Sequence, residues 1–306
     1  MSKVNPSNMA HSVRDRLLAI AHRDGADFNI LLTRYVVERF LYRLSLSEHR
    51  ERFVLKGAML FAVWVKKEHR PTRDLDLLGY GEFTEDGVRT MFGSILAVVV
   101  PDDGVIFDTD SIEVSEIRAE EEYRGRRVRV TARIGAARIH LQVDIGTGDA
   151  VLPAPRKVKF PVLLESMPAP QLRAYTMETV VAEKLQAMAS LGMLNSRMKD
   201  LYDLWTLSNS FEFEGVSLVR AIEATFDRRK TVFTEELPAG LTDEFARDSA
   251  KQIQWNAFLR NHKLEAGLAL NDITRALRVF LEEPYRAAAN RKTFAKHWQA
   301  GVSKWS

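Results

Sequence analysis

Two aspartates separated by one residue, Asp74 and Asp76, are the side chains in this sequence best suited to chemistry. They alternate with Leu75 and Leu77, and residues two apart in a β-strand point to the same side. Both carboxylates would therefore project from one face, where they repel each other unless a cation lies beside them. Because Mg²⁺ binds carboxylates, water and nucleotide phosphates, the pair predicts a metal and nucleotide site. The alternative is a polar strand end or turn without a ligand.

A turn of small residues, Gly57-Ala58, precedes this strand and opens the apolar run from Met59 to Val65. We expect a helix there, and small residues at a helix N-terminus let backbone amides approach a triphosphate. A polar turn with Pro71 then leads into the aspartate strand. Thr72 lies two residues before Asp74, so its hydroxyl is expected on the carboxylate face. Phosphorylation of Thr72 would add about two negative charges there and impair binding of metal and nucleotide.

A third acid, Asp144, lies near the end of an alternating segment whose residues Leu141 and Val143 are expected to face inward. Placed beside the strand of Asp74 and Asp76, it would complete a set of three carboxylates. Such a set can hold two Mg²⁺ ions about 4 Å apart, which suits in-line displacement at the α-phosphorus of a nucleoside triphosphate. His140 shares this face, and we interpret it as a polar strand residue rather than a ligand.

Two further charged sites lie on helices expected in the second half of the chain. Lys184 is flanked by the apolar stripe of a helix over residues 177–192, where a partly buried lysine can neutralise triphosphate charge. Asp200 and Asp203 lie three residues apart, and therefore on one helix face. Two interpretations stay open for them: a salt-bridged helix, or an acid that orients the active-site lysine or base.

The elements that must position these residues follow from the periodicity of apolar residues. Helical spacing extends over residues 10–24 and 27–46, and Thr84 is the expected N-cap of a helix that reaches Val99. A meander of three strands is expected next, with turns at Tyr123 to Gly125 and at Gly135-Ala136, and with strands at about 105–118, 126–134 and 137–145. A Pro-rich connection over 153–170 follows, and beyond it the pattern is wholly helical.

Bulk composition narrows the class of protein. The 306 residues are 46% hydrophobic and 28% charged, as in ordinary globular proteins, and cysteine is absent, which excludes disulfides and thiolate chemistry. The N-terminus lacks the apolar core of a secretory signal, and no apolar run approaches the ~20 residues that span a bilayer. We therefore expect a cytoplasmic protein without a membrane partner. The net charge of +3 means that nucleic-acid affinity must come from local clusters of charge.

Two such basic clusters are present, and both have a second interpretation. Arg127, Arg129 and Arg133 alternate with apolar residues in the middle strand of the meander, so one face is basic. The C-terminal part, about 211–306, combines arginines and lysines with Trp298 and Trp305, a composition that suits an RNA backbone and unstacked bases. In each case an exposed surface without a ligand would have the same composition.

Four segments, in order over about residues 53–205, resemble the AbiEii/AbiGii toxins, which include the MenT toxins and are nucleotidyltransferases of the DNA polymerase β-like superfamily. FVLKGAML with RPTRDLDLL resembles the family's small-residue turn and metal-binding aspartate pair, and LQVDIGTGD resembles its third-carboxylate strand. VAEKLQAM resembles its lysine helix, and RMKDLYDLW its acidic helix. One departure is Ala58, where the family usually has a second Gly or a Ser; alanine offers no hydroxyl to a phosphate.

The resemblance implies a toxin of a toxin–antitoxin or phage-defence pair, neutralised by a separately encoded antitoxin, that adds nucleotides to the 3′ acceptor end of tRNA. It implies that Asp74 and Asp76 bind metal with Asp144 as the third acid. It also implies that Lys184 contacts phosphates and that Asp200 is the catalytic acid of the helical part. The cofactor would be Mg²⁺ or Mn²⁺ and the substrate a nucleoside triphosphate, with nucleotide contacts assigned to Lys56, Gly57, Ala58, Arg73 and Lys184.

We therefore predict an α+β protein in two domains. Residues 1–170 form N-terminal helices and a nucleotidyltransferase-fold mixed sheet with flanking helices, and residues 171–306 form a helical C-terminal domain. The predicted activity is metal-dependent transfer from a nucleoside triphosphate to the 3′ end of tRNA, with release of pyrophosphate, which blocks aminoacylation and translation. The alternatives are transfer to a protein hydroxyl or a small molecule, and a non-enzymatic module that binds nucleic acid.

Overall fold

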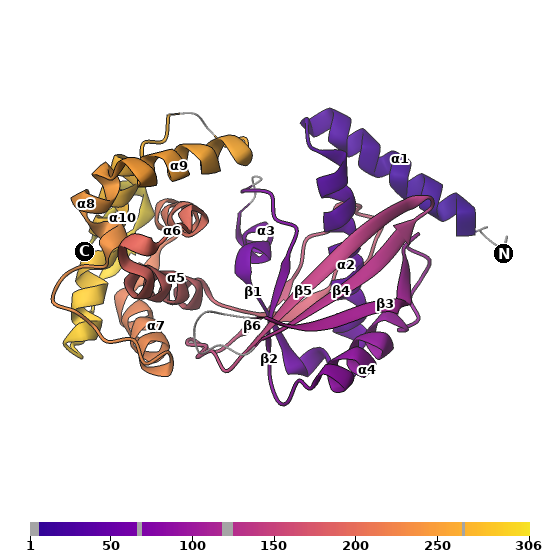
Figure 1. The fold of residues 1–306 in the computed structure, drawn as a ribbon, viewed down its shortest axis with the longest axis horizontal. Coiled ribbons are helices and arrows are strands. Elements are labelled where there is room, and N and C mark those ends of the chain that lie inside the picture. Colours follow the sequence, from indigo (N-terminus) through magenta and orange to yellow (C-terminus); the bar gives the residue numbers. More distant parts are fainter. Residues whose placement is uncertain (1–5, 66–68, 118–124, 265–266) are drawn as a thin grey trace. The chain divides into compact units, whose positions relative to one another are not determined.

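The structure, a computed structural model, describes residues 6–65, 69–117, 125–264 and 267–306. The chain forms two compact units, the first made of Met1–Gly148 with Arg156–Ala174 and the second of Asp149–Pro155 with Tyr175–Ser306 (Figure 1). Helices flank a mixed sheet in the first unit, and helices dominate the second. The predicted α+β class, with a mixed sheet followed by a helical part, is confirmed.

The first unit is organised around a sheet that has seven strands among the described residues, in the order β3-β4-β5-β2-β1-β7-β6. The predicted meander is confirmed, because β3, β4 and β5 pair antiparallel in succession. β2 pairs parallel with β5 and antiparallel with β1, which makes the sheet mixed. The strands are β1 (Phe53–Lys56), β2 (Leu75–Gly79), β3 (Ile106–Ile117), β4 (Gly125–Ile134), β5 (Ala137–Thr147), β6 (Arg156–Lys159) and β7 (Gln171–Ala174).

One face of this sheet is covered by helices and contains the core of the unit. α2 packs against β5 and β7, α1 packs on α2, and α4 packs on β3 (Figure 1). Leu141, Val143 and Ile145 of β5 are buried on the helix-covered face, so the intervening residues of β5 project from the opposite face. The helical segments are α1 (Pro6–Asp24), α2 (Phe28–Leu46), η1 (Arg50–Arg52), η2 (Gly57–Leu60), α3 (Phe61–Trp64) and α4 (Glu85–Leu96).

The second unit is mainly helical, with a small three-stranded sheet of order β10-β9-β8 among its described residues. Its helices are α5 (Met177–Leu191), η3 (Gly192–Leu194), α6 (Met198–Ser210), α7 (Gly215–Arg228), η4 (Ala239–Leu241), α8 (Asp243–Arg247), α9 (Ser249–Asn261), α10 (Leu270–Ala289) and η5 (Ala300–Val302), and its strands are β8 (Phe213–Glu214), β9 (His297–Gln299) and β10 (Lys304–Trp305). In the described parts of both units, no helix combines the length and the apolar character needed to cross a bilayer.

The observed helices and strands match some sequence-based expectations and differ from others. Thr84 caps α4 as predicted, since its hydroxyl accepts a hydrogen bond from the Gly87 N–H. The expectation of a bare connection over 153–170 followed only by helices is wrong, because β6 pairs antiparallel with β7. β6 has the sequence RKVK and three of its four residues are exposed, so it lacks the apolar alternation of a half-buried strand. Tyr123 and Arg124 of the predicted turn lie outside the described residues.

Candidate active site

Four charged residues from four adjacent strands form one row across the sheet. Asp76 of β2 is the register partner of both Asp144 in β5 and Lys56 in β1, and Asp144 is also the partner of Arg127 in β4. Side chains of direct register partners share a face of the sheet. We call Arg127, Asp144, Asp76 and Lys56 the charged row; it lies on the face opposite α2. The prediction that Asp144 lies beside the aspartate strand is confirmed.

The other aspartate of the pair, Asp74, lies just before β2 and joins this row. It is exposed, and its Oδ1 accepts a hydrogen bond of 3.2 Å from Nε2 of Gln142, which shares the face of Asp144. The pKa of Arg127 is raised chiefly by its hydrogen bonds to Asp144, and the negative charges of Asp144, Asp74 and Asp76 raise it further against the opposing effect of burial. All three predicted carboxylates therefore lie near a single guanidinium.

Arg127 holds Asp144 through both of its carboxylate oxygens. Arg127 Nε donates to Oδ1 at 2.8 Å and Nη2 donates to Oδ2 at 2.7 Å, a bidentate and charge-assisted geometry. The sequence interpretation placed Arg127 on a basic face and missed this pair. Counting outward from the predicted turn at Gly135-Ala136 would have found it, because antiparallel pairing from that turn sets Arg127 opposite Asp144.

The small-residue turn lies directly against the aspartate strand. Gly57 has φ of +72°, and a Cβ built on it would lie 2.0 Å from Oδ2 of Asp76, so only glycine fits. Ala58 is not among the residues with positive φ, so its side chain is compatible with the turn. The predicted helix after Gly57 is present but short, as the 3₁₀ segment η2 followed by the four residues of α3. Arg73, the other predicted nucleotide contact, is exposed.

The donor set of this site suits a hard divalent cation. Asp74, Asp76 and Asp144 offer only carboxylate oxygens, the ligands that Mg²⁺ and Mn²⁺ prefer. In their present positions, His, Asp and Glu side chains of the described residues do not form a group of three or more able to hold a metal ion. Since both oxygens of Asp144 contact Arg127, a metal ion bound by all three carboxylates would compete with this guanidinium for Asp144.

Lys184 and Asp200 lie in the second unit, where they form a buried ionic cluster with two neighbours. Lys184 Nζ lies 2.5 Å from Asp200 Oδ1 and 2.8 Å from Asp203 Oδ2, and these three side chains are at most 14% exposed. Arg197 Nε lies 2.6 Å from Asp200 Oδ2, as an ion pair rather than a well-directed hydrogen bond. The geometry of the salt-bridged helix interpretation is therefore observed.

Electrostatics keep this cluster ionised in spite of its burial. Burial alone lowers the pKa of Lys184, but the attraction of Asp200 and Asp203 is larger in sum, so the pKa of Lys184 is raised. Burial likewise raises the pKa of Asp200, and Lys184 and Arg197 together reverse this effect, so its pKa is lowered. The prediction that Lys184 is partly buried is confirmed. The phosphate-binding role of Lys184 and the catalytic role of Asp200 stay predictions.

A second ion pair of this unit escaped the sequence analysis. Arg229 Nη2 donates to Asp149 Oδ1 at 2.9 Å, and the side chain of Asp149 is 3% exposed. Glu183, next to Lys184 in sequence, lies 3.4 Å from the same Nη2. Sequence gives little signal for this pair, because Asp149 and Arg229 are separated by 80 residues.

Thr72, the predicted phosphorylation site, lies in the irregular segment before β2 and is half-buried. Together with Ala58, Arg34 and Trp64 it lines a pocket of about 570 Å³ in the first unit. Its modification stays a prediction.

The two basic clusters predicted from the sequence differ in exposure: two arginines of β4 lie on the surface, whereas the C-terminal tryptophans are buried. Arg129 and Arg133 of β4 are exposed, and their contact with phosphate or RNA stays a prediction. Trp298 and Trp305 are only 1% and 9% exposed, and their indole N–H groups donate to the carbonyls of Ser208 and Phe280. The expectation that these tryptophans stack on unpaired bases is therefore wrong, since both rings belong to the core.

Comparisons with known proteins add to this geometry. A family model described as "Nucleotidyl transferase AbiEii toxin, Type IV TA system" matches residues 39–290. The crystal structure of JHP933 from Helicobacter pylori is similar with a TM-score of 0.46 and 16% identity, covering 83% of this chain and 90% of that one. A "putative nucleotidyltransferase" from H. pylori gives 0.42 and 15%, covering 84% and 95%. No curated protein matches the chain.

Proposed function

We propose a function from one premise: the chain belongs to the AbiEii family of nucleotidyltransferase toxins of type IV toxin–antitoxin systems, whose model matches residues 39–290. On this premise, the protein transfers a nucleotide from a nucleoside triphosphate to the 3′ acceptor end of tRNA. A tRNA extended in this way no longer accepts its amino acid, so translation stops. The observation that supports the proposal is the convergence of Asp74, Asp76 and Asp144 beside the Gly57 turn.

In the proposed reaction, the RNA 3′-hydroxyl releases its proton to water as its oxygen forms a bond to the α-phosphorus, and the bond from that phosphorus to the pyrophosphate leaving group breaks. Asp74 and Asp76 would hold Mg²⁺ or Mn²⁺, with Asp144 as the third acid. The ion supplies charge neutralisation at the triphosphate and increases the acidity of the attacking hydroxyl. The Gly57 turn lets the backbone approach the phosphates, and Lys56 places positive charge beside Asp76.

A direct experiment identifies the acceptor of the nucleotide. Purified protein is incubated with each of the four α-labelled nucleoside triphosphates, together with either total RNA or a protein extract. We expect label in small RNA only, with added nucleotides at tRNA 3′ ends when these ends are sequenced. Label in the protein fraction alone would refute the tRNA assignment and support a protein hydroxyl as the acceptor.

Regulation by an antitoxin partner forms part of the same proposal. Thr72 precedes Asp74 by two residues, and a phosphate on its hydroxyl would add about two negative charges close to the proposed metal ligands. Mass spectrometry of toxin that is co-expressed with its antitoxin tests this directly. Unmodified Thr72 in toxin that the antitoxin has silenced would refute phosphorylation as the mode of control.

A further inference from the structure

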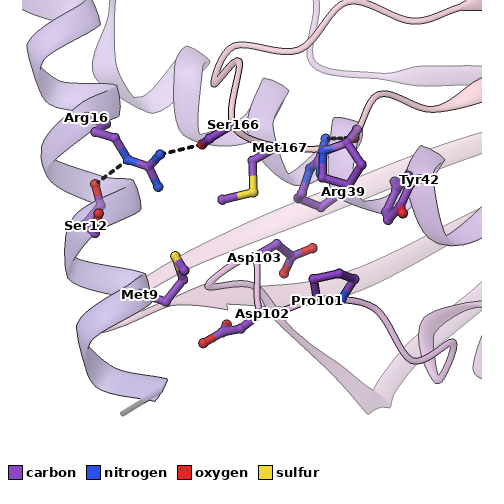
Figure 2. A pocket seen from close by; sticks show the side chains of 11 residues that line it. Met9, Ser12, Arg16, Arg39, Tyr42, Pro101, Asp102, Asp103, Ser166 and Met167 are labelled. Atoms are coloured by element: carbon purple, nitrogen blue, oxygen red, sulfur yellow. Dashed lines mark hydrogen bonds between the residues drawn. The ribbon is translucent and has the colours of Figure 1, made fainter. Parts of the chain in front are cut away.

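A second pocket of the first unit lies on the helix-covered side of the sheet, away from the charged row. It has a volume of about 380 Å³ and is formed by α1, α2, the 101–103 loop and the 166–168 segment (Figure 2). α2 packs on the face of β5 opposite Asp144, so the sheet separates this pocket from the charged row. A cavity of this size falls within the ~300–1,000 Å³ range of small-molecule sites.

The side chain of Arg39 is the unusual feature of this pocket. Arg39 is 0% exposed, and one of its nitrogens, Nη2, donates to the carbonyl oxygen of Pro168 at 3.0 Å. Its Nε and Nη1 are buried and have no acceptor. The rings of Tyr35 and Tyr42 lie 5.6 and 5.5 Å from the guanidinium carbon, which offsets only part of the desolvation cost. A buried guanidinium with unsatisfied donors is costly, and an anion is the natural acceptor.

A second guanidinium lines the same pocket from α1. Arg16 Nη1 donates to the Ser166 hydroxyl at 2.8 Å and Arg16 Nε donates to the Ser12 carbonyl at 3.2 Å, both neutral partners (Figure 2). Within the described part of the chain, neither Arg16 nor Arg39 has a carboxylate oxygen within 4.0 Å. The pocket therefore presents two arginines whose charge is not paired with an acid at contact distance.

The acids around the pocket do not cancel this charge. Asp103 is held by Arg43 at 2.7 and 3.2 Å, so its charge is already paired. Asp102 is exposed, and its Oδ1 accepts from the Gly104 N–H. Glu38, next to Arg39 on α2, has its pKa raised to about 7 by burial, against the effects of its hydrogen bond from the Leu163 N–H and of nearby arginines. Near neutral pH it carries only part of a negative charge.

We propose that this pocket is a binding site for a small molecule that carries an oxyanion, either phosphate or carboxylate. Arg16 and Arg39 line the pocket, and both would donate to the anion together with the hydroxyl groups of Ser12 and Ser166, once the side chains that cover Nε and Nη1 of Arg39 shift aside. The pocket is larger than a bare phosphate requires, and Met9, Met167 and the Tyr42 ring add apolar wall (Figure 2). The ligand class is therefore an anion with an apolar or aromatic body, of which a nucleoside monophosphate is the phosphate form and an aromatic carboxylate the other.

The test is calorimetric titration of the full-length wild-type protein without divalent metal, because without a cation Asp74, Asp76 and Asp144 repel an anionic probe. Inorganic phosphate, AMP and benzoate are the probes. We expect saturable binding of at least one probe, with a Kd below about 1 mM. Arg16→Gln should weaken it about tenfold, since hydrogen bonds to charged groups contribute about that factor. Arg14→Gln is the matched control, because Arg14 is exposed on the same helix and does not line the pocket.

The three probes separate the possible ligands. Binding of AMP assigns a phosphate with an aromatic body, and binding of benzoate assigns a carboxylate. Ser166→Ala serves as a second variant, and it should weaken binding without removing a charge. Absence of saturable binding of all three probes up to about 10 mM, or equal binding by wild type and Arg16→Gln, would overturn the proposal. This pocket does not include Asp74, Asp76 or Asp144. Either result therefore leaves the transferase proposal to its own tests.

Discussion

Replacing Arg127 with glutamine is expected to increase the affinity of the site for divalent cations. In the present structure both oxygens of Asp144 accept hydrogen bonds from Arg127, at 2.8 and 2.7 Å. A metal ion that uses Asp144 as a ligand competes with this ion pair for the carboxylate. Removing the guanidinium eliminates that cost and also leaves Asp74 and Asp76 with less neighbouring positive charge, so both effects favour the ion.

The size of the effect follows from the geometry of the pair. Hydrogen bonds that involve charged groups contribute about 1.5–3 kcal/mol net. The side chains of Arg127 and Asp144 are 32% and 18% exposed, so solvent screens the pair and the lower end of that range applies. About 1.5 kcal/mol corresponds to roughly a tenfold change in the dissociation constant.

The assay is titration of the protein with Mn²⁺ in the absence of nucleotide, followed by calorimetry or by electron paramagnetic resonance of the free ion. Arg129→Gln is the matched control: Arg129 lies two residues along the same strand face, but it donates to the amide oxygen of Gln142 instead of to a carboxylate. We expect about tenfold tighter binding for Arg127→Gln and little change for Arg129→Gln. Equal affinities in the two variants, or weaker binding by Arg127→Gln, would refute the competition between guanidinium and metal.

Three further predictions concern stability. Burial raises the pKa of Glu38 to about 7 from an ordinary 4.5. As pH rises between these values the unfolded chain loses the Glu38 proton before the folded protein does, so the stability of the wild type falls. Melting curves should therefore show that Glu38→Gln stabilises the protein more at pH 8 than at pH 5, and equal stabilisation at the two pH values would contradict the shift. Gly57→Ala places a Cβ 2.0 Å from Oδ2 of Asp76 at a residue with φ of +72°, and it should lower the free energy of unfolding in urea by at least about 1 kcal/mol. Unchanged stability would contradict the close contact between Gly57 and Asp76. Lys184→Met leaves Asp200 and Asp203 without their shared cation and should lower the free energy of unfolding, measured in urea, by about 3–5 kcal/mol. A decrease below about 1 kcal/mol would show that the lysine does not stabilise the fold.

Much of the first unit follows from local pattern, because the decisive signals there are short in range. Apolar alternation identified the meander strands, and Thr84 identified the start of α4. The relation between Asp76 and Asp144 required an assumption about which strands pair, and the parallel register confirms it. The Arg127–Asp144 pair was within reach of the same reasoning, since the hairpin turn fixes which residues face each other.

Other features depend on tertiary contacts that sequence does not reveal. β6 has no alternating apolar pattern, and it is a strand only because β7 lies beside it. Trp298 and Trp305 lie among basic residues in the sequence, yet packing around Phe280 buries both rings. The unpaired nitrogens of Arg39 arise from the way α1, α2 and two loops enclose it, which no local pattern encodes.

The most direct test of the central claim, that the converging carboxylates carry out nucleotidyl transfer, is nucleotide incorporation into RNA by Asp76→Asn. The amide has the shape of the carboxylate but lacks its charge, and Asp110→Asn on β3 is the control, since Asp110 is exposed and outside the charged row. With thermal melting to show that both variants are folded, we expect incorporation by Asp76→Asn to fall at least about a hundredfold. Asp110→Asn should stay within about twofold of wild type. Full incorporation by a folded Asp76→Asn protein would contradict the account.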